Sequence, residues 1–150
     1  NSGEGWIQFS VSKYYPKLTE ILKMCQIISA KTEFQKYFPE DVGKWKIMAL
    51  RHYITIPTSS NITHQVIGFG DSVHDRNAIF DLQHHLKLKK KHILVKNLKF
   101  IKQPTLDDLI SQHNLVADVL NDIHEQETQL DLILDPLPQF KLKRRSENDI

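Results

Sequence analysis

Cysteine is almost absent from this sequence: Cys25 is the only one in 150 residues. One thiol cannot close an internal disulfide, so disulfide-stapled secreted domains are excluded and we expect an intracellular protein, in the cytoplasm, where thiols stay reduced. No apolar run approaches the roughly 18 residues of a membrane-spanning helix, and the N-terminus lacks the charged and then apolar pattern of a signal peptide. We therefore expect no membrane partner.

Surplus charge of either sign is also scarce. The net charge is +2, and the last fifteen residues account for all of it, with basic Lys141, Lys143, Arg144 and Arg145 against acidic Glu147 and Asp149. The rest of the chain is neutral, whereas a broad nucleic-acid-binding face needs clustered positive charge. The basic run at residues 84–92 has no such patch around it and is interpreted as a solvated connector. We expect no nucleic-acid partner.

Short apolar segments typical of strands alternate with amphipathic segments typical of helices. Strands are predicted at residues 26–29, 66–70 and 93–95, and residues 6–11 fit a short strand or an extended lead-in. Such alternation predicts an α/β fold, with a parallel sheet and flanking helices. Four helices are predicted: one after Pro16, one after the N-cap Asp41, one at residues 75–86 and one after the N-cap Thr105. In the last of these the side chains expected to face inward are Leu106, Leu109, Ile110, Val116, Leu120 and Ile123.

The chain is long enough for about one domain. Residues 1–134 carry the alternating pattern and are predicted to form its core. Residues 135–150 contain two prolines and a basic cluster, so they are predicted to form a flexible basic tail, with a nuclear-import or partner-docking segment as the lesser alternative.

The strongest chemical signal is the predicted strand-to-helix loop at residues 70–75. Asp71 and Asp75 stand four residues apart there, with Ser72 between them. Two neighbouring carboxylates suit Mg²⁺, and a serine or free backbone N–H groups at a helix start can meet an anion such as phosphate. The same residues also suit a helix cap and a complement to the helix dipole. Spacing alone leaves both interpretations open.

Two further residues gain interest from their positions. Ser29 ends a predicted strand, where its hydroxyl could bond a phosphate oxygen, although such serines usually bond the turn backbone. Lys44 and Lys46 flank Trp45 at the start of a predicted helix, and a lysine can reach a phosphate as a point charge. Ligands of parallel sheets bind beyond the carboxyl ends of the strands, which is where Ser29 and residues 70–75 are expected.

Taken in order, these elements resemble the haloacid dehalogenase-like (HAD) phosphohydrolases, and most closely a little-studied eukaryotic HAD-like subgroup. The resemblance covers roughly residues 6–134 and is carried by Ile27-Ile28-Ser29-Ala30-Lys31-Thr32-Glu33-Phe34, Trp45-Lys46, Gly70-Asp71-Ser72 and the run from Lys99 to Gln112. It implies a Rossmann-like core that hydrolyses a phosphorylated substrate with Mg²⁺. It also implies roles for phosphate-binding Ser29, charge-stabilising Lys46 and metal-binding Asp71 supported by Asp75. Ser72 is a second candidate for binding phosphate because of its position at the helix start.

One part of the family pattern is missing. HAD enzymes begin with a strand ending in Asp-x-Asp, whose first aspartate attacks phosphorus, and no Asp-x-Asp occurs in these 150 residues. Residue 1 is Asn rather than Met, so we expect the first strand to lie upstream. Two hypotheses follow: a Mg²⁺-dependent phosphomonoesterase that an upstream Asp-x-Asp completes, and a non-catalytic HAD-like interaction module. The 150 residues alone are expected to be inactive.

Overall fold

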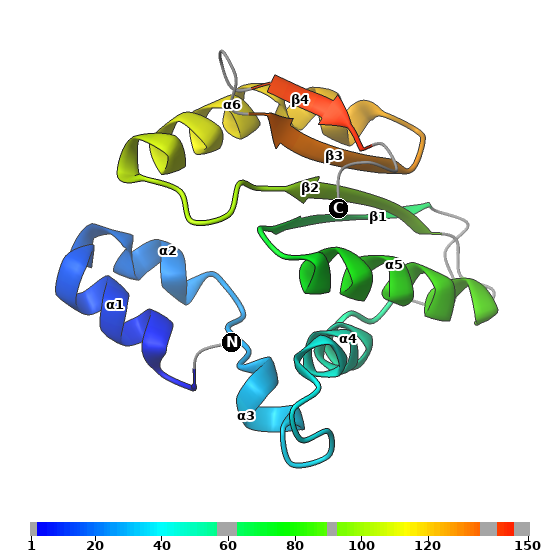
Figure 1. The fold of residues 1–150 in the computed structure, drawn as a ribbon, viewed down its shortest axis with the longest axis horizontal. Helices are drawn as coiled ribbons and strands as arrows, with labels where there is room; N and C mark the ends of the chain where they lie inside the picture. The colour runs from blue at the N-terminus through cyan, green and yellow to red at the C-terminus, as the bar shows by residue number, and fades with distance from the viewer. Residues whose placement is uncertain (1–2, 57–62, 90–92, 136–140, 146–150) are drawn as a thin grey trace.

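The protein is described here by a computed structural model that covers residues 3–56, 63–89, 93–135 and 141–145 (Figure 1). Its centre is a four-stranded sheet of mostly parallel strands in the order β1-β2-β3-β4, in which only β4 is antiparallel to its neighbour. The predicted α/β class is confirmed. The strands are β1 (His64–Gly70), β2 (Ile93–Lys99), β3 (Leu130–Asp135) and β4 (Lys141–Arg144).

Two long helices cover the two faces of this sheet (Figure 1). Helix α5 (Val73–Leu88) buries Ile79, Leu82 and Leu86 against β2, and helix α6 (Leu106–Glu125) buries Val116 and Ile123 against β2 and β3. Strand β2 is therefore apolar on both sides, as is typical of a parallel strand between two helical layers.

A second helical layer packs outside α5. Helix α4 (Val42–Tyr53) lies against α5, and the short helix α3 (Ala30–Phe34) lies against α4. The predicted N-cap Asp41 is confirmed, because its Oδ1 accepts a hydrogen bond of 3.0 Å from the backbone N–H of Lys44. Trp45 is buried and donates from Nε1 to the Phe38 carbonyl at 2.6 Å, which fixes the start of α4.

Residues 6–11, predicted to be extended, are helical instead. They belong to α1 (Trp6–Tyr14), which is followed by the 3₁₀ turn η1 (Pro16–Leu18) and by α2 (Thr19–Lys23). The prediction was wrong because the apolar spacing fits two periods. Ile7, Phe9 and Val11 alternate as on a strand, whereas Trp6 and Phe9 meet at i, i+3 on a helix, with ring centroids 6.5 Å apart. In Figure 1 this helical pair lies to one side of the sheet.

Residues 26–29 do not form the predicted strand. They carry no strand assignment, and residues 27–29 are half-buried between α2 and α3. A strand requires a partner for its backbone groups, and among the described residues none pairs with this segment. The apolar side chains of Ile27 and Ile28 correctly predicted burial, but they wrongly predicted hydrogen bonding to a neighbouring strand.

The C-terminal region contains two strands that the sequence did not reveal, β3 and β4. The predicted flexible tail is wrong for residues 141–144, which pair antiparallel with β3 in the register Leu134↔Leu142. Leu142 packs against the core cluster under α6, and the backbone N–H of Arg145 donates to the Asp131 carbonyl at 2.8 Å. Residues 136–140 and 146–150, the rest of that predicted tail, lie outside the described residues.

Helix α6 begins as predicted, with a capping box in which Thr105 and Asp108 satisfy each other's backbone N–H groups. Its inward face is narrower than predicted, since Val116 and Ile123 are buried but Leu106, Leu109, Ile110 and Leu120 are exposed. In the part of the chain that the structure describes, no helix is long and apolar enough to cross a membrane.

Candidate functional site

The loop between β1 and α5 is built as a tight helix start. Ser72 is the N-cap, and its Oγ accepts from the backbone N–H of Asp75 at 3.3 Å while its own hydroxyl donates to Asp75 Oδ2 at 2.6 Å. A side chain at Gly70 would collide with the carboxyl group of Asp75, so this close approach requires glycine. The cap interpretation is therefore confirmed for Ser72, with Asp75 in the first turn of the helix as its capping-box partner, whereas Asp71 has no part in this capping box.

Lys46 reaches this loop from α4. Its Nζ forms an ion pair with Asp75 Oδ1 and lies 3.5 Å from Ser72 Oγ. Partial burial raises the pKa of the Asp75 carboxyl, but the hydrogen bonds from Lys46 and Ser72 outweigh this effect and leave the pKa below its ordinary value. Asp75 is thus a charged carboxylate with a fixed position, and Lys46 is the cation that holds it.

Ser29 belongs to the same region. It is the N-cap of α3, with its Oγ accepting from the Thr32 backbone N–H at 3.2 Å and lying 2.8 Å from Thr32 Oγ1. Ser29, Lys46 and Asp75 all line one cavity of about 580 Å³. The structure therefore brings together three of the five predicted site residues from three separate elements, and Ser72 joins them through its contacts with Lys46 and Asp75.

Asp71 is placed differently from the other four. Its side chain is exposed, it is not among the cavity-lining residues, and it makes no hydrogen bond or ion pair within the described part of the chain. Asp71 directly precedes Ser72 in the loop, and its exposed carboxylate is accessible to a cation from solvent.

The described residues alone make an incomplete site for Mg²⁺. Both oxygens of Asp75 are engaged, Oδ1 by Lys46 and Oδ2 by Ser72, which leaves Asp71 as the available carboxylate of the predicted pair. Residues 3–56, 63–89, 93–135 and 141–145 contain no group of three His, Cys, Asp or Glu side chains that could hold a metal ion. Mg²⁺ needs only one or two protein carboxylates beside water, so Asp71 together with one further carboxylate would complete such a site.

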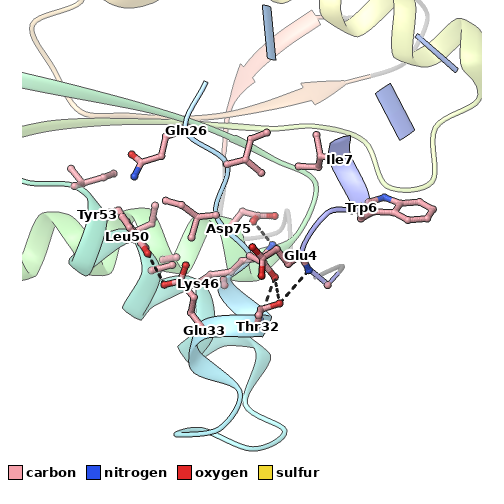
Figure 2. Close-up of a pocket in the computed structure, with 18 of the residues that line it drawn as sticks. Glu4, Trp6, Ile7, Gln26, Thr32, Glu33, Lys46, Leu50, Tyr53 and Asp75 are labelled. Carbon is pink, nitrogen blue, oxygen red and sulfur yellow. Dashed lines mark hydrogen bonds and ion pairs between the residues drawn. The ribbon is translucent and has the colours of Figure 1, made fainter. Parts of the chain in front are cut away.

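Two residues that the sequence did not reveal, Glu33 and Tyr53, also line the cavity (Figure 2). Glu33 from α3 accepts a hydrogen bond of 2.7 Å from the Tyr53 hydroxyl at the end of α4, and both residues line the cavity. The hydrogen bond to the Glu33 carboxylate raises the pKa of Tyr53. No local pattern marks this pair, because the two residues are twenty positions apart in helices whose packing is a tertiary feature.

Asn97 is a second residue that the sequence analysis missed. It is 2% exposed in β2, lines the cavity, and donates from Nδ2 to Asp131 Oδ1 at 2.8 Å. Arg76 donates from Nε to the other Asp131 oxygen at 2.7 Å. A signal was present in the sequence: an amide within an apolar strand must be hydrogen-bonded when buried, so it marks either a network or a site.

The cavity lies between β1 and the segment at residues 26–29. Gly68 and Phe69 line it from β1, Ile27 and Ile28 from residues 26–29, and Ala49 from α4. Gln26 and, from α4, Leu50 also line it and are labelled in Figure 2. The polar groups that line the cavity include a lysine, hydroxyls and carboxylates, and apolar side chains line much of the rest.

Comparison with known proteins gives no family for this chain. No family model matches it, and no curated protein or solved structure is significantly similar to it. The site must therefore be interpreted from its own geometry.

Proposed function

We propose that this chain is the larger part of a HAD-like phosphohydrolase core, which hydrolyses a phosphomonoester with Mg²⁺ once an aspartate from outside these 150 residues is supplied. The observation that carries the proposal is the meeting of Ser29, Lys46 and Asp75 around one cavity beside β1, with Ser72 in contact with Lys46 and Asp75. These residues come from three elements far apart in the sequence, and their order is the order on which the HAD resemblance rests.

The residues have distinct roles in this proposal. The hydroxyl of Ser29 binds a phosphate oxygen. Ser72 stands at the N-terminus of α5, where the helix dipole favours an anion, and binds phosphate when its hydroxyl turns away from Asp75. Lys46 balances negative charge on the phosphoryl group, and Asp75 holds Lys46 in place through their ion pair. An ammonium preorganised in this way stabilises developing charge without reorganising during the reaction.

Mg²⁺ would be held by Asp71 together with a carboxylate of the supplied Asp-x-Asp segment. When bound, it neutralises charge on the phosphoryl oxygens. The supplied aspartate is the nucleophile, because the sequence contains no Asp-x-Asp and the resemblance assigns Asp71 and Asp75 to the metal and its support.

The second candidate is a non-catalytic HAD-like interaction module. The observation that favours it is that Lys46 and Asp75 satisfy each other, as in a purely structural ion pair. In that case the cavity serves a binding partner and the acidic loop serves only as a helix cap.

A fusion experiment separates the two candidates. A strand of roughly ten residues ending in Asp-Val-Asp is joined before Asn1 through a Gly/Ser linker, since Gly3, Glu4 and Gly5 line the cavity. We expect Mg²⁺-dependent hydrolysis of 4-nitrophenyl phosphate by the fusion, and none by the 150-residue chain or by a matched Asn-Val-Asn fusion. Lys46→Met in the active fusion should abolish turnover. A folded Asp-Val-Asp fusion without activity would favour the interaction module.

A further inference from the structure

Helix α1 exposes a cluster of aromatic side chains. Trp6 is 56% exposed and Phe9 is 54% exposed, and their ring centroids lie 6.5 Å apart. The Nζ of Lys13 lies 5.5 Å from the centroid of the Phe9 ring and 5.1 Å from that of Tyr14, so these four residues form one continuous surface, the α1 patch. Neighbouring exposed side chains of this size are typical of a surface that binds another macromolecule.

The rest of the fold gives this region little cover. α1, η1 and α2 pack on one another and make few contacts with the other described elements, and none of their residues is buried. The large apolar side chains exposed in this segment are Trp6, Ile7, Phe9, Tyr14, Tyr15, Leu18, Ile21 and Met24. So much apolar surface on a segment without a buried residue indicates that a partner covers part of it.

Helix α6 carries a second apolar stripe beside the one that faces the sheet. Leu106, Leu109, Ile110 and Leu120 were predicted to face inward, but all four are exposed. Their spacing, with exposed Ala117 between the last two, places these five residues along one side of the helix, the α6 stripe. Exposed leucine and isoleucine side chains in a row are suited to bury the aromatic side chains of a partner.

The charge around the α1 patch is positive. Residues 6–25 contain three lysines and one acid, Glu20, which pairs with Lys23 at 2.7 Å. The other two lysines, Lys13 and Lys17, are exposed and form no ion pair with the described residues. Unpaired lysines beside an apolar surface favour a partner with exposed carboxylates.

The charge around the α6 stripe is negative. Helix α6 contains five acidic residues and no lysine or arginine. Asp118, Asp122 and Glu125 are exposed, follow one another at helical spacing along one flank of the stripe, and have no ion-pair partner in the part of the chain that the structure describes. The α1 patch and the α6 stripe therefore complement each other both in apolar character and in charge.

We propose that this chain binds a second copy of itself through these two surfaces, with the α1 patch of each copy packed on the α6 stripe of the other. Every copy carries one patch and one stripe, so two copies related by a two-fold axis make the contact twice and leave neither surface open. In this dimer Lys13 and Lys17 of one copy face Asp118 and Asp122 of the other. The proposal does not depend on the chemistry of the cavity.

Sedimentation equilibrium of the 150-residue chain tests this self-association. We expect a monomer–dimer equilibrium that shifts toward the dimer as the concentration rises. The double variant Lys13→Glu with Lys17→Glu makes the patch acidic, and the double variant Asp118→Lys with Asp122→Lys makes the stripe basic. Either change places like charges on the two surfaces, so each should raise the dissociation constant of the dimer by at least about tenfold.

Mixing the two double variants is the sharpest part of the experiment. In a mixed pair the acidic patch of one variant meets the basic stripe of the other, while the unchanged patch and the unchanged stripe meet each other. Both contacts are then complementary again, so the equimolar mixture should form dimers close to the level of the parent chain. A loss of folding in either variant could not be restored in this way, and circular dichroism verifies the fold of each.

Two control variants lie outside both surfaces. Lys36→Glu with Lys87→Glu makes the same change of charge at two exposed lysines, and Lys36 lies over the Tyr37 ring much as Lys13 lies over Phe9. This variant should dimerise like the parent. For the apolar contact, Ile110→Ser in the stripe should weaken the dimer by about tenfold, whereas Leu88→Ser, at an exposed leucine of α5, should not change it.

Three results would overturn the proposal. The first is a 150-residue chain that is monomeric at every concentration measured, which would assign the patch to the same chain's α6 or to another protein. The second is a mixture of the two double variants that dimerises no better than its components. The third is an equal weakening of the dimer by Lys36→Glu with Lys87→Glu, which would show a general effect of charge.

Discussion

The two edges of the sheet differ in how they meet their surroundings. At one edge, β4 presents Lys141, Lys143 and Arg144 as exposed side chains, and charged residues of this kind prevent an edge strand from pairing with further chains. At the other edge, β1 presents an apolar sequence to a cavity that residues 26–28 also line, and these residues make no backbone–backbone hydrogen bond within the described part of the chain. The exposed charges of β4 protect that edge against further strand pairing, whereas the apolar sequence of β1 is typical of a strand inside a sheet.

This difference connects the fold to the candidate site. The ion pair between Lys46 and Asp75 and the N-cap Ser29 all lie along the β1 side, while the residues of β4 have no part in that cavity. A strand that completed the β1 edge would deliver its last residues to these side chains. The chemistry and the open edge are therefore two aspects of one region.

The largest effect on the free energy of unfolding is expected in β2, the core strand that lies between the two edges of the sheet. Leu98 of β2 is fully buried, so Leu98→Ala should lower the free energy of unfolding by about 2–5 kcal/mol. Leu142 of β4 is only half-buried, and Leu142→Ala should cost clearly less. Urea unfolding measures both. Equal losses of unfolding free energy would mean that Leu142 is as much part of the core as Leu98. The β4 edge would then not be a peripheral part of the fold.

A smaller effect is expected for the ion pair on the β1 side. Lys46→Met leaves Asp75 partly buried without its cation and should lower the free energy of unfolding by about 1–3 kcal/mol. Lys44→Met is the matched control on the same helix: Lys44 pairs with Asp41 at the surface, 3.3 Å away, and such a pair contributes about 0–1 kcal/mol. If both variants lose the same amount in urea unfolding, the Lys46–Asp75 pair is an ordinary surface contact.

The pH dependence of that loss should follow the pKa of Asp75. This pKa is lower in the folded protein than its unfolded value of 3.8, so the stabilisation is fully present above about pH 5 and is lost as the pH falls below 3.8. The difference in unfolding free energy between the parent and Lys46→Met should therefore be constant near neutral pH and shrink in acid. A difference that instead shrinks as the pH rises above 7 would assign the effect to another group.

The smallest effect is expected at the β4 edge. Lys141 is exposed, so Lys141→Thr should change the free energy of unfolding by no more than about 0.5 kcal/mol in urea unfolding. A clearly larger loss of unfolding free energy in Lys141→Thr would show that this edge contributes more to the fold than an exposed edge strand does.

The sequence predicted well those elements whose signal is local. The N-caps Asp41, Ser72 and Thr105 lie where capping chemistry placed them, because a cap depends on residues only three positions apart. Residues 26–29 show the limit: their apolar character predicts burial, but strand pairing depends on a neighbour that the described residues do not contain. Residues 141–144 show the reverse, since a polar segment becomes a strand by pairing with β3.

The buried polar residues were the least predictable. Lys96 is fully buried in β2, and burial lowers the pKa of its ammonium. Its Nζ donates to the carbonyls of Ile123 at 2.6 Å and His124 at 2.8 Å, so it satisfies the C-terminal end of α6. In the candidate site, the resemblance pointed to Ser29, Lys46 and Asp75, which the fold brings together. Glu33 and Tyr53 became visible only with tertiary packing, and the chemical roles of all five stay predictions.

The most direct test of the open β1 edge is amide hydrogen exchange, followed residue by residue in the 150-residue chain and in its Asn-Val-Asn fusion. We predict that residues 66–69 of β1 include amides that exchange much faster than those of β2 and β3 in the 150-residue chain, and that these amides and those of residues 26–28 are protected together in the fusion. Amides of β1 that are as protected as those of β2 in the 150-residue chain would contradict an open edge and, with it, the account of this region as an unfilled interior position.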